Sequence, residues 1–268
     1  LFDSWLGWLM REPQTLVLAA PALGILADAA VRTAKSRQPL RGAVLVGVGV
    51  AATVVFSSVT QQVHVFEVGK TPFETAQSFV PFALFNLLPL LAPLIVILLS
   101  LLALKAGTPA LSAAFVAAFL GVGMLFTGLV GSSAMHIDSL GLVDTTFGEA
   151  ALVYVVYGAV LSAIGALALH LGSVTGRALP DTPVLLLSLV GFVATVLSSL
   201  PHYVAGFLDQ PAATAAGYDD SGFVGIANAI VGLGHALMVV VVLAFAGLFA
   251  KSRRGDAVAD RYTQGAGA

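Results

Sequence analysis

Long apolar stretches separated by short polar segments are the main feature of the sequence. Six stretches carry no Asp, Glu, Lys or Arg over more than about 20 residues, the length that an α-helix needs to cross a membrane. They cover residues 42–66, 79–104, 106–137, 150–176, 182–208 and 221–250. A seventh, weaker stretch at 13–33 is interrupted by Asp28 and Arg32. Because every backbone amide must be hydrogen-bonded inside the hydrocarbon layer, these stretches predict helices.

This pattern predicts an all-α integral membrane protein that forms a bundle of about seven transmembrane helices. Within one transmembrane domain, residues 1–250, we expect spans at about 13–33, 42–66, 79–104, 106–132, 150–173, 182–206 and 222–250. Residues 251–268 are expected to form a polar tail. Two prolines in "NLLPLLAPL", residues 86–94, predict a kink in the third span rather than a break.

The composition supports the membrane class and excludes several others. Of the 268 residues, 58% are hydrophobic and 10% are charged, whereas soluble domains carry about 25% charged residues. The mean hydropathy is +0.98. A formal net charge of −2 leaves no basic stripe for a nucleic-acid partner. The chain has no cysteine, which excludes disulfides, thiolate metal ligands and iron–sulfur clusters. The lipid bilayer is therefore the first expected partner.

The distribution of basic residues between the predicted loops predicts an orientation. With seven alternating spans, ten of the twelve Lys and Arg residues fall on one side, and only Arg11 and Lys70 fall on the other. Cytoplasmic loops carry the excess of basic residues. We therefore expect a multi-pass protein of the cell (plasma) membrane with its N-terminus outside and its C-terminus in the cytoplasm. The loops of the second side carry the acids Glu67, Glu74, Asp138, Asp144, Asp209, Asp219 and Asp220.

Two acidic residues lie within or at the start of predicted spans, where a charge is costly and marks a functional candidate. Asp28 precedes Arg32 by four residues, which favours an i,i+4 ion pair at the membrane interface over a place in a proton path. Glu149 opens the fifth span, where a carboxylate complements the helix dipole. A proton-path role is the alternative for Glu149 as well.

The five histidines do not predict a metal site by their spacing. No two of them are four residues apart, the spacing that places two imidazoles on one helix face. His64 ends the second span at the outer interface, and a single ligand does not close a metal site. His170 and His235 lie among small apolar residues, which favours hydrogen bonds inside the bundle.

Several short motifs follow one another in an order that resembles the second half of subunit I of haem–copper terminal oxidases (cytochrome c oxidase). "REPQTLVLAAPALGIL" at 11–26 resembles that family's Gly-His-Pro-Glu-Val-Tyr helix, and "VHVFEVG" at 63–69 resembles its His-His-Met-Phe-Thr-Val-Gly turn. "TGLVGSSAMHIDSLGLVDTTFGEAALVYVVYGAVLSAIGAL" at 127–167 resembles the segment that leads to its His-Phe-His-Tyr-Val helix. The resemblance covers nearly the whole chain as the last seven of twelve helices. It implies other oxidase subunits, or an N-terminal half of subunit I, as partners, and the start at Leu1 agrees with a fragment of a longer protein.

The metal ligands of that family are largely missing from this chain. The resemblance places a copper-ligating histidine on Glu12 and the two haem-ligating histidines on Ala151 and Val153. His64 is the one remnant of the copper position, and Asp144 is a remnant of the outer metal site. A haem iron needs an axial imidazole, thiolate, thioether or phenolate. We therefore expect neither haem nor copper in this chain, although the family binds both.

Three hypotheses for the function follow. The first, which we favour, is a degenerate subunit-I-like membrane component of a respiratory haem–copper oxidase, redox-silent in this half and acting in assembly or docking. The second is the active subunit I of a divergent terminal oxidase, which passes electrons to O2 and translocates protons, with His64 and His136 or His202 as ligands. The third is a seven-helix transporter or channel that depends on Asp28 and Glu149.

Overall fold

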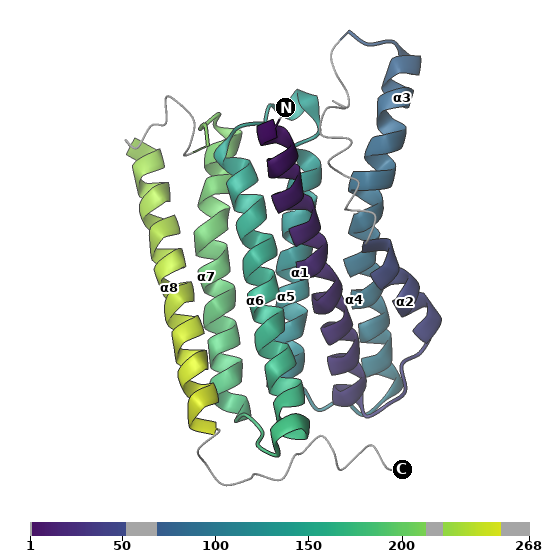
Figure 1. Ribbon diagram of the computed structural model, residues 1–268, viewed down its shortest axis with the longest axis vertical. Coiled ribbons are helices and arrows are strands. Elements are labelled where there is room, and N and C mark those ends of the chain that lie inside the picture. The colour runs from purple at the N-terminus through teal and green to yellow at the C-terminus, as the bar shows by residue number, and fades with distance from the viewer. Residues whose placement is uncertain (1, 52–68, 213–221, 253–268) are drawn as a thin grey trace.

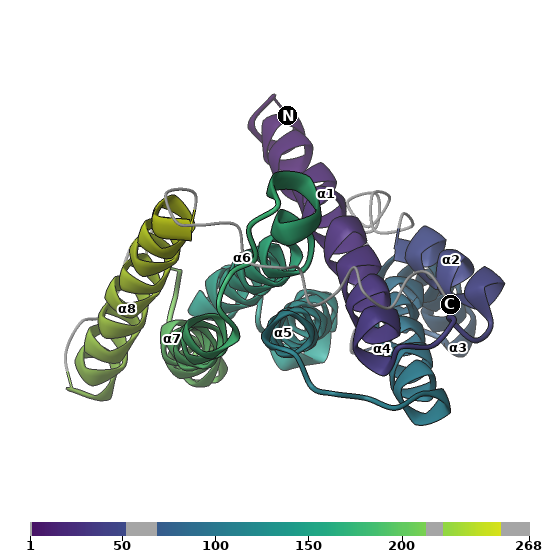
Figure 2. The same ribbon diagram turned by 90° about the horizontal axis from the view of Figure 1, so that it is seen from below.

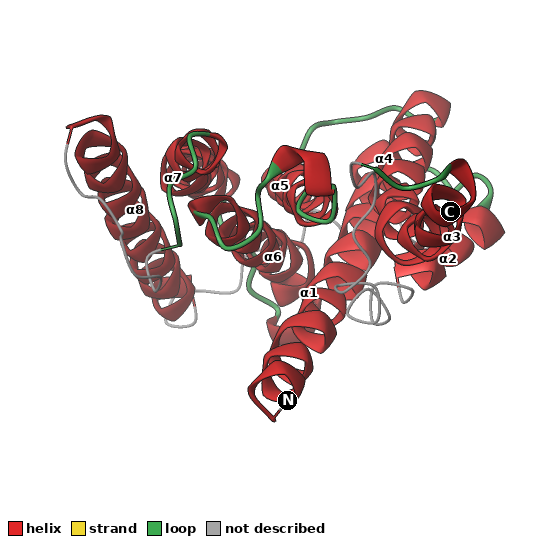
Figure 3. Ribbon diagram, turned by 90° about the horizontal axis from the view of Figure 1, so that it is seen from above, coloured by secondary structure: helices red, strands yellow, loops and turns green. Residues whose placement is uncertain are grey.

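The computed structural model describes residues 2–51, 69–212 and 222–252, together with the side chains from residue 17 onward except that of Phe85. Helices make up the ordered structure in these ranges, with no strand among them (Figure 3). The α-helices are α1 (Phe2–Ala34), α2 (Arg41–Val50), α3 (Pro72–Phe82), α4 (Leu88–Ala106), α5 (Ala113–Ala134), α6 (Thr146–Thr175), α7 (Asp181–Phe207) and α8 (Gly222–Ser252). A π-helical turn, η2 (Ala83–Leu87), joins α3 to α4, and a short 3-10 helix, η3 (Asp138–Leu140), precedes α6.

Six of the described helices are long and apolar enough to cross a membrane. They are α1, α4, α5, α6, α7 and α8. This confirms the predicted all-α class, and the six apolar helices make the chain a multi-pass membrane bundle. Of the predicted span at 42–66, the structure describes only α2 and residue 51; the remainder, including His64, lies outside the described residues.

The fourth span begins later in the structure than predicted. We expected it to begin at residue 106, whereas α5 begins at Ala113. Gly107 ends α4 in an extended conformation, and the amides of Thr108 and Ala110 donate to the Ala34 and Thr33 carbonyls at the end of α1. The intervening residues are therefore held as a loop against α1, and Ser112 caps the first turn of α5.

The prolines of the third span leave the helix continuous, as predicted. The chain passes from α3 through η2 into α4 without a break, although Pro81 and Pro93 lie inside helices and Pro89 lies in the first turn of α4. A proline has no N–H to donate and clashes with the carbonyl four residues earlier. The π turn widens the helix just before Pro89 and accommodates that clash.

The helices form an open row (Figures 1 and 2), in which neighbouring long helices run in opposite directions except α1 and α4, which run in the same direction. Along the row α8 contacts α7, α7 contacts α6, α6 contacts α5, α5 contacts α1, α1 contacts α4 and α4 contacts α2; α5 also contacts α7, and α1 also contacts α6. The chain enters α2 at one end of the bundle and α3 at the opposite end (Figure 1). Six of the seven predicted spans correspond to described long helices, and the span at 42–66 lies largely outside the described residues.

The two ends of the bundle differ in charge. We name the end where α1, α4, α6 and α8 finish the basic end, because the described basic residues gather there. These are Arg32, Lys35, Arg37, Arg41, Lys105, Arg177 and Lys251. The opposite, acidic end has Asp138 and Asp144 before α6 and Asp209 after α7, with Lys70 before α3. The structure thus separates the charges as the loop assignment predicted.

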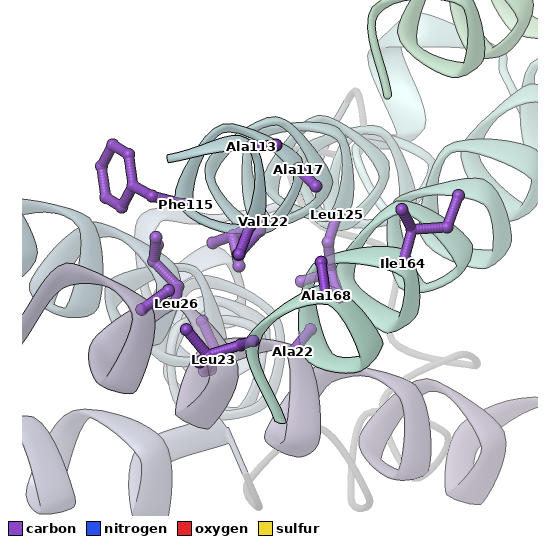
Figure 4. Close-up of a cluster of buried hydrophobic side chains, with 14 of the residues drawn as sticks. Ala22, Leu23, Leu26, Ala113, Phe115, Ala117, Val122, Leu125, Ile164 and Ala168 are labelled. Atoms are coloured by element: carbon purple, nitrogen blue, oxygen red, sulfur yellow. The ribbon is translucent and has the colours of Figure 1, made fainter. Parts of the chain in front are cut away.

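The core lies where α1, α5 and α6 meet (Figure 4). Leu23 and Leu26 of α1 and Val122 and Leu125 of α5 are fully buried there, and Ala168 of α6 packs on the same cluster. In a bilayer the lipid tails are as apolar as these side chains, so close packing rather than water exclusion holds such helices together.

Glycines make the contact between α5 and α6 especially close. We call Gly121 and Gly128 of α5 and Gly158 and Gly165 of α6 the glycine seam. A Cβ added to Gly158 would lie 2.6 Å from the Gly121 carbonyl oxygen, and one added to Gly128 would lie 2.7 Å from the Ala151 carbonyl oxygen. Only residues without a side chain allow the two backbones to approach this closely.

Candidate functional site

A polar cluster lies where α6, α7 and α8 meet near the acidic end of the bundle. We call Glu149, His202 and Asn228 the acidic-end triad, one residue from each helix. The His202 Nε2 is 3.1 Å from the Asn228 Oδ1, and the His202 Nδ1 is 4.0 Å from the Glu149 Oε2. The imidazole is largely buried, with 12% of the side chain exposed, whereas Glu149 is 34% exposed. The carboxylate therefore lies between the buried histidine and the surface.

Backbone and hydroxyl hydrogen bonds position α6 against α7 at this triad. The Thr146 hydroxyl donates to the His202 carbonyl at 3.0 Å. The Thr146 amide donates to the Gln210 carbonyl, and the Ala212 amide donates to the Asp144 carbonyl. The Thr145 hydroxyl accepts from the Phe147 amide and caps α6. The first turn of α6, with Glu149 in it, is therefore tied to the end of α7.

A second polar pair lies deeper in the same seam. The Tyr157 hydroxyl and the His235 Nδ1 are 2.6 Å apart, joining α6 to α8. Tyr157 follows Glu149 by eight residues, about 12 Å along the axis of α6. His235 follows Asn228 by seven residues, which keeps both side chains on one face of α8. We call the acidic-end triad and this pair together the polar seam.

A third cluster joins α1 to α6 at the basic end. Asp28 pairs with Arg32 at 3.3 Å, so the ion pair expected from their spacing is present. The His170 Nε2 is 3.2 Å from the Asp28 Oδ2, and its Nδ1 is 3.3 Å from the Arg32 Nη2. Because the guanidinium only donates, Nδ1 accepts and Nε2–H donates to the carboxylate. These contacts fit a neutral imidazole held as one tautomer.

The residues singled out for a family-type metal site are not brought together in the described part of the chain. Asp144 is exposed in the loop before α6, with a positive φ of 59°. Its backbone carbonyl, rather than its carboxylate, makes the contact with Ala212. Among the described side chains, from residue 17 onward, no three His, Asp or Glu residues gather closely enough to hold a metal ion. The prediction for His64 stays a prediction, because His64 lies outside the described residues.

The two positions that the resemblance assigns to haem ligands lie on α6. Ala151 is 1% exposed and Val153 is half-buried, and neither side chain has a donor atom for iron. The Ala151 backbone also packs directly against Gly128 of α5. These residues do not fit a haem ligated from α6.

Sequence reasoning identified Glu149 and Asp28 but missed their partners on other helices. It expected His170 and His235 to be hydrogen-bonded inside the bundle, and both are. It did not connect His202 with Glu149 and Asn228. A signal was present in the spacing: Asn228 and His235 are seven residues apart on α8, and Glu149 and Tyr157 are eight apart on α6. Polar residues at such spacing mark one helix face that turns toward polar neighbours.

Comparison with known proteins assigns no family to the chain: no family model matches it, and no curated protein matches it significantly. The fold and the clusters define the class of protein at a coarser level. The chain is a multi-pass α-helical membrane protein with ionisable residues paired between its helices.

Proposed function

We propose that the chain is a degenerate, subunit-I-like membrane component of a respiratory haem–copper oxidase, in which this half is redox-silent and acts in assembly or docking. The order of its motifs supports this proposal, and the six long apolar helices of the described residues agree with a membrane subunit. In this proposal the basic end faces the cytoplasm of a cell membrane, because cytoplasmic loops carry the excess of Lys and Arg.

Ala151 and Val153 of α6 carry the redox-silent part of the proposal, because their side chains have no donor atom for iron. In the resemblance these positions belong to haem-ligating histidines, and here they hold one buried methyl group and one half-buried isopropyl group. A shift by one residue brings no histidine to either position, because α6 has none before His170. An iron at this level of α6 would have no axial ligand from that helix.

The open row of helices supports a role in assembly. Only 28% of the residues in the apolar window of α8 are buried, compared with 56% for α5. The edge helix α8 makes its main contact with α7 alone, and leucines and valines such as Leu233, Val240 and Leu243 are exposed along it. Other transmembrane helices, such as those of an N-terminal half of subunit I, would cover such a surface.

The test is to purify the full chain, with whatever it binds, from its native membrane in mild detergent. Absorption spectra, metal analysis and peptide identification are then compared for the complex and for the chain separated from it. We expect the complex to contain haem-bearing oxidase subunits and the separated chain to show no Soret absorption. The His64→Ala and His202→Gln variants should leave the spectrum of the complex unchanged.

Two outcomes would contradict the proposal. A Soret band in the separated chain that is lost in His64→Ala would favour the active divergent oxidase. A preparation free of oxidase subunits, with solute transport in vesicles that is lost in Asp28→Asn, would favour a transporter or channel. Both outcomes are independent of the proton-binding behaviour considered next, which requires neither haem nor an oxidase partner.

A further inference from the structure

We propose that Glu149, His202 and Asn228, the acidic-end triad, form a proton-binding site that opens to the acidic end of the bundle. The ligand is the proton itself, taken from water at that end. Because Asn228 presents its Oδ1 to the His202 Nε2 at 3.1 Å, that nitrogen carries a proton and donates.

The other imidazole nitrogen of His202, Nδ1, faces the Glu149 carboxylate. The His202 Nδ1 lies 4.0 Å from the Glu149 Oε2. A neutral imidazole protonated on Nε2 would present its Nδ1 lone pair to an anionic oxygen, which is repulsive. One additional proton removes this repulsion. If it binds Nδ1, the histidine becomes an imidazolium beside the carboxylate; if it binds Glu149, the carboxylate becomes neutral. The arrangement with Asn228 as acceptor therefore holds one proton more than a neutral histidine and a carboxylate together.

The same three side chains also have an arrangement without that proton. If the Asn228 amide turns by half a rotation, its NH2 donates to Nε2, and the single imidazole proton moves to Nδ1, toward Glu149. The two arrangements differ by one proton and by the orientation of one amide. The site therefore binds a proton with a rotation of the amide, and Nε2 keeps its hydrogen bond to Asn228 in both states.

The position of the triad determines the side from which the proton comes. Glu149 lies in the first turn of α6 and is 34% exposed, whereas His202 is 12% exposed behind it. Below the triad the polar seam continues only to Tyr157 and His235. From there to His170 on α6, to Asp181 on α7 and to Lys251 on α8, these helices carry no ionisable side chain. The seam is therefore a site with one entrance rather than a path across the membrane.

Other titratable groups near the triad are few and can be named. Tyr154 and Tyr157 of α6, Tyr203 of α7 and His235 of α8 lie in or beside the seam. At the acidic end, His136 follows α5 and Asp209 follows α7. Glu149 is the carboxylate nearest the imidazole of His202 in the described structure, so its removal is the decisive change.

The test uses the full chain in lipid vesicles and infrared difference spectra between acidic and neutral pH, with labelled histidine and asparagine to assign the bands. We expect the wild type to show carboxyl, imidazole and asparagine-amide changes that titrate together. Glu149→Gln should abolish the His202 imidazole change along with its own carboxyl change. Asn228→Leu should abolish the amide change.

Glu74→Gln is the matched control. Glu74 is an exposed carboxylate near the same end of the bundle and pairs with Thr71 rather than with a histidine. This variant should lose one carboxyl change and leave the imidazole and amide changes intact. Acidifying only the bath that contacts the acidic end of uniformly oriented vesicles should produce the full wild-type difference spectrum.

The proposal is overturned if the His202 bands persist in Glu149→Gln, because the two groups then do not share a proton. It is equally overturned if His202 keeps one protonation state throughout the titration, as a purely structural hydrogen bond would. If Glu149→Gln does not fold, His202→Gln provides the same test from the other partner: the Glu149 carboxyl change must then change or disappear.

Discussion

The two faces of α6 hold their neighbours in different ways. Toward α5, the helix offers Gly158 and Gly165, and the backbones meet almost directly. Toward α7 and α8, it offers Glu149 and Tyr157, which reach histidines on those helices. The glycine seam has no ionisable group, whereas the polar seam joins ionisable groups of α6, α7 and α8.

The two faces of α6 therefore have different roles: the glycine seam stabilises the fold, and the polar seam carries the ionisable groups. Interhelical hydrogen bonds in membranes contribute about 0.6 kcal/mol on average and at most about 1.7 kcal/mol. Forcing additional atoms into a tightly packed contact costs about 1–3 kcal/mol. The glycine seam is therefore the greater determinant of the fold. The polar seam contributes less to stability, and its expensive ionisable residues are better explained by function.

The largest loss of stability is expected from a substitution that adds atoms to the glycine seam. Gly158→Ala places a Cβ 2.6 Å from the Gly121 carbonyl oxygen and 2.8 Å from the Leu125 nitrogen. Because both are backbone atoms, α5 and α6 must separate, and we expect a loss of about 1–3 kcal/mol. Gly123→Ala is the matched control on α5, where no atom lies within 4 Å of the added carbon. Unfolding in a denaturing detergent titration measures both, and an equal effect of the two variants would refute the glycine seam.

A smaller effect is expected from the polar seam. Tyr157→Phe removes the hydroxyl that lies 2.6 Å from the His235 Nδ1, and we expect a loss of about 0.6–1.7 kcal/mol. A double-mutant cycle with His235→Leu isolates the pair, because Tyr157→Phe should cost almost nothing once His235 is gone. If Tyr157→Phe lost as much stability as Gly158→Ala, the polar seam and the glycine seam would not differ in their contribution to the fold.

The smallest effect is expected at Glu74, a carboxylate that is exposed to water, unlike Glu149 in the polar seam. The backbone N–H of Thr71, and next its hydroxyl, hydrogen-bond Glu74 and hold the pKa of this carboxyl below its ordinary value. A lowered pKa in the folded state means that the contribution to stability is present above the ordinary carboxyl pKa and is lost as the pH falls through the lowered value.

Hydrogen-exchange protection of the first turn of α3 measures this contribution. In the wild type we expect protection to decrease at acidic pH, corrected for intrinsic exchange. In Glu74→Gln, which keeps the capping box without the charge, protection should be independent of pH in that range. The glycine and polar seams should be unaffected by this variant, and a decrease of protection in α6 would contradict the local character of the cap.

Features that depend on one helix alone were predictable from the sequence. The apolar stretches identified the long helices, and the two prolines of residues 86–94 were correctly expected to leave α4 unbroken. The i,i+4 spacing of Asp28 and Arg32 predicted their ion pair. The start of α5 was missed by seven residues, because hydropathy does not register that the loop before Ala113 is held by carbonyls of α1.

What the sequence by itself determined is the class of protein: a charge-poor chain has to place its apolar stretches in lipid as helices, and its loop charges separate two ends. The tertiary structure alone decided which helix faces meet, and with them the partners of Glu149, His170 and His235. The physical reason is that lipid is as apolar as a leucine side chain. Hydropathy therefore has the same value for a face that meets lipid and for one that meets another helix, and only close packing and interhelical hydrogen bonds distinguish the two.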